Sequence, residues 1–186
     1  MDSGASVSGD ERIRLFVAYT LALDDRERIS AWQHAELAGS RARLVPLEHL
    51  HFTIAFLGPR PREEIEPIAE VIRSATVGAG PMPLELSRYR ETRSVGMLVF
   101  EDASGEATRV AEAIQLGLEE IGSYRREPRG WLPHVTVLRF RKPPHLHPEL
   151  PELGRISPSG ASAYHSLLRR DGAPYDVLRS VALGGR

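Results

Sequence analysis

The sequence predicts an α/β (α+β) protein of two similar lobes, each an antiparallel sheet with outer helices, which enclose a central groove. Two observations support this fold class. Strands and helices alternate as strand–helix–strand–helix twice along the chain, and each half contains one His-x-Thr motif. The first ten residues are rich in Ser, Gly and Asp and predict a disordered tail. Residues 11–186 then form the expected single bilobed domain.

The first half of the domain is expected to hold two strands, each followed by a helix. The run IRLFVAYTL at 13–21 predicts a buried strand, and the aspartates at 24–25 can cap a helix that ends near residue 39. The run HFTIAFLG at 51–58 predicts the second strand. A helix over 62–76 carries an apolar stripe, and Pro67 inside it predicts an irregular first turn.

The second half repeats this order and adds hairpins. Residues 84–92 and 95–102 predict two strands joined by a short loop, and 105–121 predicts a long amphipathic helix. The run WLPHVTVLRF at 131–140 predicts a further strand. Two strands joined by an Asp-Gly turn are expected within 156–183.

Composition excludes several classes of protein. The chain has no cysteine, which excludes disulfides, thiolate nucleophiles and cysteine-based metal sites. It has no apolar run near the roughly 18 residues that a membrane span needs, and no signal peptide, so we expect a cytoplasmic protein that does not enter membranes. The formal net charge of −1 argues against a protein that coats long nucleic acids. One stretch, Ser123 to Lys142, is nevertheless basic, with six cationic side chains against Glu127 alone.

The motif that carries chemistry occurs twice, as His51-Phe52-Thr53-Ile54 and His134-Val135-Thr136-Val137. Residues two apart on a strand share a face, so His51 and Thr53 lie together, as do His134 and Thr136. The opposite faces are expected to enter the core: Phe52, Ile54, Phe56, Val135 and Val137. Each motif therefore presents an imidazole beside a hydroxyl, and approximate twofold symmetry between the lobes would make the two pairs face each other.

Two imidazoles facing one phosphate have a specific chemical use. Opening a cyclic phosphodiester requires a base that takes a proton from water and an acid that protonates the departing ribose oxygen. Histidines with pKa values near neutrality can perform both roles, and the hydroxyls can donate hydrogen bonds to the phosphate oxygens. We therefore expect His51 and His134 as catalytic residues, with no metal and no cofactor. A single His-x-Thr can arise by chance, and the repetition on matching strand–helix units favours a site.

The chain resembles the 2H phosphoesterase superfamily, and most closely its RNA 2′,3′-cyclic phosphodiesterase branch, also called 2′-5′ RNA ligases. RLFVAYTL, VPLEHLHFTIAFLG, WLPHVTVLRF and AYHSLLRRDGAPYDVL match that family in order, over about Arg12 to Leu183. The resemblance implies a bilobed fold around a groove and hydrolysis of RNA 2′,3′-cyclic phosphate ends to 2′-phosphates. It also implies that His51 is the acid, that His134 is the base, and that Thr53 and Thr136 bind the phosphate; the two labels could exchange.

Other residues carry weaker signals. Arg139 completes an HxTxxR string and could neutralise phosphate charge, but strict alternation turns it away from His134 unless a bulge intervenes. His49 replaces an Asn that is frequent in the family and could tune the pKa of His51; we expect instead an exposed loop histidine. The His145-x-His147 pair lacks further ligands and predicts no metal site. Trp131 could stack on a base and is expected to be a core residue.

The sequence leaves several functions open. The expected partners are RNA ends or short oligonucleotides with a cyclic phosphate, bound by a monomer, and the resemblance also allows reversible 2′-5′ ligation. The same chemistry on a cyclic nucleotide, a 2′-5′ oligonucleotide or ADP-ribose cyclic phosphate is an alternative. A non-catalytic RNA-binding relative is a further alternative, which two intact motifs disfavour.

Overall fold

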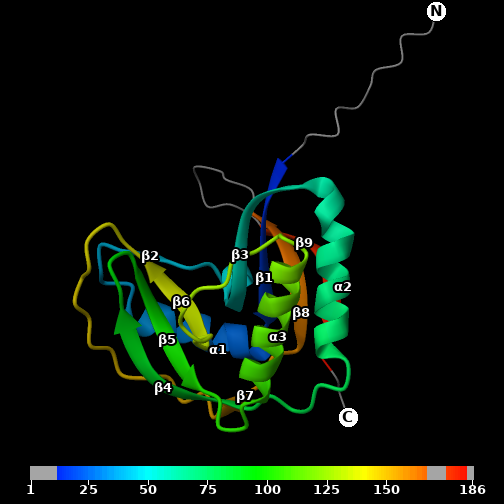
Figure 1. The fold of residues 1–186 in the computed structure, drawn as a ribbon. Helices are drawn as coiled ribbons and strands as arrows, with labels where there is room; N and C mark the ends of the chain where they lie inside the picture. Colours follow the sequence, from blue (N-terminus) through cyan, green and yellow to red (C-terminus); the bar gives the residue numbers. More distant parts are fainter. Residues whose placement is uncertain (1–11, 167–174, 184–186) are drawn as a thin grey trace, which may run out of the picture.

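A nine-stranded antiparallel sheet organises the computed structural model, which describes residues 12–166 and 175–183 (Figure 1). The strands follow the order β7-β4-β5-β6-β3-β1-β8-β9, and β2 pairs with β6. Their bounds are β1 Arg12–Thr20, β2 Arg43–Leu44, β3 His51–Pro61, β4 Leu84–Glu91, β5 Val95–Glu101, β6 His134–Arg139, β7 Arg155–Ile156, β8 Gly160–Ser166 and β9 Tyr175–Ala182.

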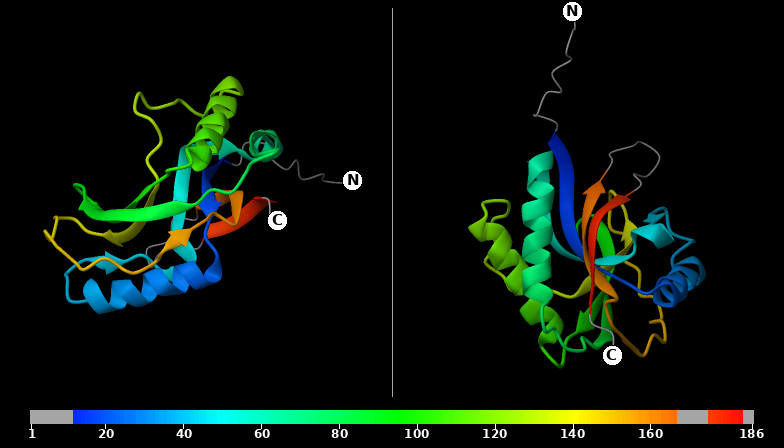
Figure 2. Two further views of the ribbon diagram at one scale, coloured as in Figure 1. Left: turned by 90° about the horizontal axis from the view of Figure 1, so that it is seen from below. Right: turned by 90° about the vertical axis from the view of Figure 1, so that its right-hand side faces the viewer.

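Three α-helices cover the sheet: α1 Leu23–Glu36, α2 Ile65–Thr76 and α3 Glu106–Glu120. Short 3₁₀ helices, Leu47–His49 and Arg62–Glu64, precede β3 and α2. Figure 2 shows α2 and α3 together on one side of the strands and α1 on the other. Within the described part of the chain, no helix is both long and apolar enough to cross a bilayer.

The core lies between the helices and the faces of the strands that turn toward them. Val17, Phe52, Leu98 and Val135 are fully buried there, and each such side chain contributes roughly 1.5–3 kcal/mol to folding when it leaves water. Because strand side chains alternate, burial of these residues turns their neighbours toward the other face, where the two His-x-Thr motifs lie.

The predicted fold class is confirmed, with one addition. The sheets of the two lobes are not separate: they join through a single residue pair, Phe52 with Val135, between β3 and β6. The predicted disordered tail and the Asp-Gly turn lie outside the described residues.

The predicted helices are present, and two details differ. The N-cap of α1 is Ala22, so Asp24 and Asp25 lie inside the first turn and do not cap the helix; their charge there complements the positive end of the helix dipole. In the second helix, the irregular start expected near Pro67 is the 3₁₀ turn Arg62–Glu64, which leads into α2.

Candidate active site

The two His-x-Thr motifs meet at the junction of the two halves of the sheet. Phe52 of β3 pairs with Val135 of β6 in antiparallel register. This register places His51 across from Thr136, and Thr53 across from His134. All four side chains are half-buried, whereas the residues between them, Phe52 and Val135, are fully buried. The structure therefore brings the four predicted site residues together on one face.

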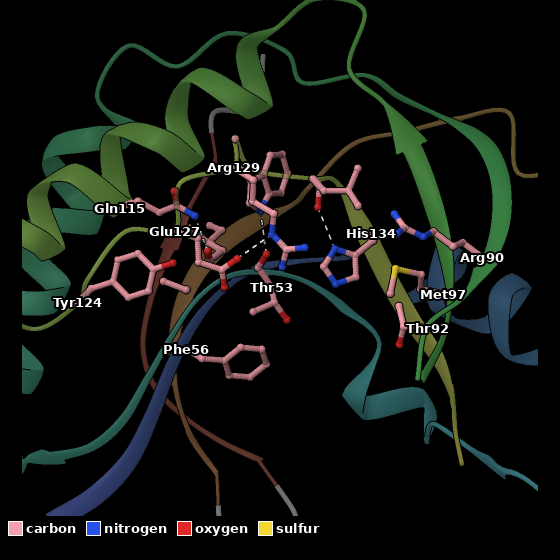
Figure 3. A pocket seen from close by; sticks show the side chains of 15 residues that line it. Thr53, Phe56, Arg90, Thr92, Met97, Gln115, Tyr124, Glu127, Arg129 and His134 are labelled. Atoms are coloured by element: carbon pink, nitrogen blue, oxygen red, sulfur yellow. Dashed lines mark hydrogen bonds and ion pairs between the residues drawn. The ribbon is translucent and has the colours of Figure 1, made fainter. Parts of the chain in front are cut away.

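Both imidazole rings are held by the backbone two residues earlier in the chain. Nδ1 of His134 lies 2.8 Å from the carbonyl oxygen of Leu132 (Figure 3). The His51 ring makes a hydrogen bond to the backbone of His49. A ring that donates its Nδ1 proton to a carbonyl keeps Nε2 for a substrate and cannot turn freely. The motifs thus orient their rings by the same local device.

Burial favours the neutral form of both histidines. The pKa of His51 falls from 6.5 to about 3, chiefly through desolvation; the charges of His49, Arg139 and His134 also lower it, and the hydrogen bond to the His49 backbone raises it. Desolvation also lowers the pKa of His134, with contributions from Arg129 and Arg90. The charge of His134 is a small contribution to the low pKa of His51, so His51 lies within electrostatic range of His134. An anion placed between them would raise both pKa values.

The low pKa of His51 has a structural cause, because aromatic rings cover one face of its imidazole. The Phe16 ring stacks on the His51 ring with centroids 5.0 Å apart, and Tyr164 stacks on Phe16 at 4.9 Å. Phe16, Ala18 and Tyr164 form a small buried cluster separate from the main core. Water is thereby excluded from one face of His51. Local sequence pattern does not reveal the stack that includes Tyr164, because stacking between three strands depends on their register.

Two β-bulges change which side chains reach the site. On β3, Val17 pairs with Ala55 and Ala18 pairs with Thr53, so Ile54 is the extra residue. On β6, Gly96 pairs with Leu138 and Met97 pairs with Thr136, so Val137 is the extra residue. A bulge reverses the alternation beyond it. Each motif is therefore followed by a side chain that returns to the groove face five residues after its histidine.

These two returning side chains are Phe56 and Arg139. The prediction that Phe56 enters the core is wrong: it is 67% exposed, because the bulge at Ile54 turns it outward. Arg139 follows the bulge at Val137, is exposed, and lowers the pKa of His51 through its charge. Strict alternation predicts that Arg139 points away from the face of His134, whereas the bulge places both residues on the same face of the strand.

A buried glutamine from a helix holds each bulge. Gln115 of α3 donates to the carbonyl oxygen of Ile54 at 2.8 Å, and Gln33 of α1 donates to that of Val137 at 2.6 Å. Each carbonyl belongs to the extra residue, whose regular ladder bond is disrupted. Gln115 gives the buried Ile54 carbonyl a donor, and Gln33 gives the Val137 carbonyl a second donor beside the Val45 N–H at 3.0 Å. Sequence reasoning missed both, since a polar residue on a helix does not reveal its partner.

A cavity of about 260 Å³ opens beside His134 and Thr53 (Figure 3). Phe56, Tyr124 and Trp131 supply aromatic surface, and Arg90 supplies positive charge. Arg129 also lines the cavity, where it pairs with the carboxylate of Glu127 at 2.7 Å. Trp131 donates its indole N–H to the Thr53 carbonyl oxygen at 2.8 Å and packs on the core. It therefore fulfils the expectation of a packing residue and also lines the cavity.

Three further histidines, for which the sequence left a role open, lie in two kinds of surroundings. His49 is half-buried in the 3₁₀ helix before β3, so the expectation of an exposed loop residue is wrong. Burial lowers its pKa, and its charge acts on His51. His145 and His147 are exposed. Across residues 12–166 and 175–183, no three His, Asp or Glu side chains gather to hold a metal ion, and metal independence stays a prediction.

Known proteins resemble this chain in sequence. The 2′-5′ RNA ligase superfamily profile matches residues 23–171. A Thermus thermophilus RNA 2′,3′-cyclic phosphodiesterase is 29% identical over 183 residues (93% of this chain and 91% of the relative). An Archaeoglobus fulgidus protein of the same name is 31% identical over 154 residues (77% and 80%).

Solved structures share the fold. A Thermus thermophilus protein superimposes with a TM-score of 0.76 at 26% identity, over 92% of this chain and 98% of that one. E. coli LigT with 3′-AMP superimposes with a TM-score of 0.78 at 22% identity, over 94% and 100%. From the profile match over most of its length, the chain belongs to the 2′-5′ RNA ligase superfamily of 2H phosphoesterases.

Proposed function

We propose that the protein hydrolyses the 2′,3′-cyclic phosphate at the end of an RNA to a 2′-phosphate, using His51 and His134 as acid and base. The observation that carries this proposal is the square of two imidazoles and two hydroxyls at the β3–β6 junction. Two relatives named RNA 2′,3′-cyclic phosphodiesterase support the substrate class. A cyclic phosphate is small and anionic, which suits a half-buried site bordered by Arg139.

The proposed reaction assigns one proton transfer to each histidine. His134, neutral at the start, takes a proton from water through Nε2 while the water oxygen bonds to phosphorus. His51, protonated when substrate is bound, gives its proton to the 3′ oxygen as the bond from phosphorus to that oxygen breaks. The products are a 2′-phosphate and a 3′-hydroxyl, and a proton exchange with solvent restores both histidines.

Three further side chains act on the phosphate. The hydroxyls of Thr53 and Thr136 donate to its non-bridging oxygens, whose charge grows in the transition state. Arg139 adds a positive charge on the same face. The bound anion raises the low pKa of His51, so the acid gains its proton together with the substrate. His51 is therefore neutral in the free protein and protonated in the substrate complex.

The cavity beside His134 is suited to the terminal nucleobase. A base that enters it can stack on Phe56, which is exposed, and meet the edges of Tyr124 and Trp131. The cavity borders Thr53 and His134, so a ribose carrying the cyclic phosphate would connect base and phosphate without a gap.

Product analysis tests the proposal. Purified protein with EDTA should convert an oligoribonucleotide ending in 2′,3′-cyclic phosphate to the 2′-phosphate. Replacement of His51 or His134 by Gln should lower kcat by about 10² or more, while H147Q, which changes an exposed histidine, should leave it unchanged. A 3′-phosphate product would reverse the assigned geometry, and a near-normal rate in H51Q would remove His51 from the mechanism.

The same groups can run the reaction backward, with a 5′-hydroxyl RNA in place of water, so reversible 2′-5′ ligation is part of the proposal. Supplying a 5′-hydroxyl RNA in the same assay tests it. A monomer in the cytoplasm remains the proposed state, to be checked by light scattering and by fractionation of cells.

A further inference from the structure

A pocket lined by cations lies at the end of β6 away from the aromatic cavity. Five of its residues are basic: Arg41 and Arg43 on one side, Arg139, Arg141 and Lys142 on the other. Its volume is about 910 Å³, and its other lining residues are Ala42, Phe140, Pro143 and Pro144. The lining thus contains no carboxylate.

Within the described part of the chain, no carboxylate pairs with the cations of this pocket. Among residues 12–166 and 175–183, none of the five cations has an ion pair or a side-chain hydrogen bond, whereas Arg73 pairs with Glu70 and Arg109 with Glu106 on the outer helices. Moreover, Arg43 and Arg139 are direct cross-strand partners. Like charges directly opposite each other destabilise a sheet. An anionic ligand would remove this repulsion.

Arg139 connects this pocket with the candidate active site. This residue lines the pocket and also lowers the pKa of His51 through its charge. Along β6 it lies three residues beyond Thr136, a span of about 7–10 Å at roughly 3.3 Å per residue with one residue in the bulge. The aromatic cavity lies at the opposite end, beside His134. A ligand held by the two histidines therefore has an aromatic cavity on one side and a cationic pocket on the other.

We propose that the pocket formed by Arg41, Arg43, Arg139, Arg141 and Lys142 binds the backbone phosphates of the RNA nucleotides that precede the cyclic-phosphate end. The assignment rests on the proposed function. Arginine binds phosphate in a bidentate manner, and the pocket has few groups that could read a base, so recognition there is independent of sequence. A single nucleotide with a cyclic phosphate has no second phosphate that could enter this pocket.

The inference is tested by comparing two substrates. Cytidine 2′,3′-cyclic monophosphate reaches only the histidines and the aromatic cavity, whereas a short oligoribonucleotide with the same end also reaches the pocket. In R41Q/R141Q, the KM for the oligonucleotide should rise about tenfold, and kcat/KM for the mononucleotide should change less than twofold. R73Q/R109Q removes the same charge from the outer helices and should leave both values unchanged.

Salt dependence gives a second readout that does not need turnover. For an RNA ending in 3′-phosphate, the slope of log Kd against log salt should fall by about 1.4 in R41Q/R141Q, since each phosphate contact contributes about 0.7 on a single strand. An unchanged slope, or an equal loss on the mononucleotide, overturns the inference. Failure of wild-type protein to hydrolyse either substrate overturns the proposed function instead, and the binding slope still decides the pocket.

Discussion

Replacement of His51 by Asn should remove a pH-dependent loss of stability. Burial lowers the pKa of His51 from 6.5 to about 3. The unfolded chain therefore binds a proton below pH 6.5 that the folded chain does not bind until about pH 3. Stability falls as the pH drops through this window and is unaffected above it.

The magnitude follows from the difference in proton binding. A pH of 5 lies 1.5 units below the pKa of 6.5 that His51 has in the unfolded chain. At about 1.36 kcal/mol per unit, protonation of the unfolded chain lowers the free energy of unfolding by about 2 kcal/mol. For a domain of this size, roughly 2–4 °C of Tm corresponds to 1 kcal/mol. Wild-type protein should thus lose about 4–8 °C more than H51N between pH 7.5 and pH 5.

Thermal melts followed by circular dichroism, at equal ionic strength, measure this difference. H147N serves as the matched control, because it makes the same substitution at an exposed histidine and should behave as wild type. If H51N loses as much Tm on acidification as wild type, then His51 is solvated in the folded state. The stacking on Phe16 would then not exclude water as argued.

Three other predictions concern the same site. Burial lowers the pKa values of both His51 and His134 in the free protein. The plot of kcat/KM against pH, which reports the free enzyme, should therefore be bell-shaped with its maximum below pH 6.5, and kcat, which reports the substrate complex, should peak at higher pH. A kcat/KM maximum above pH 7.5 would contradict this prediction. Gln33→Leu removes the side-chain donor to the Val45 carbonyl and one of two donors to the Val137 carbonyl, which still accepts from the Val45 N–H at 3.0 Å. Urea unfolding should therefore show a loss of about 1–3 kcal/mol, and an unchanged midpoint would show that water replaces the amide. Phe56→Ala should change the free energy of unfolding by no more than about 0.5 kcal/mol, because the ring is exposed. It should raise KM by about tenfold through lost stacking. An unaltered KM would show that the base does not bind in this cavity.

Much of the site could be predicted from local pattern. The period of two along a strand shows that His51 and Thr53 share a face, whatever the strand packs against. The repetition in His134 and Thr136 made a shared site the best hypothesis. The helices also follow from local apolar spacing, which explains why their bounds differ from expectation by few residues.

Phe56 and Arg139 show where this reasoning ends. Both were placed by continuing the alternation, and both lie beyond a bulge that reverses it. A bulge forms where the neighbouring strand and a buried glutamine favour it, so its position depends on residues far away in the chain. The strand pair β2–β6, which assembles the cationic pocket, is likewise a contact between segments about one hundred residues apart in sequence.

Local sequence pattern is enough to identify the candidate catalytic residues and to show which of them share a strand face, because side-chain alternation and helical periodicity act over a few neighbouring residues. The folded chain was needed to show that β3 and β6 lie side by side, that Phe16 covers His51, and that two bulges turn Phe56 and Arg139 toward the groove. The physical reason is that strand pairing and burial are properties of the whole fold: they set the register, the solvent exclusion and the pKa of each histidine.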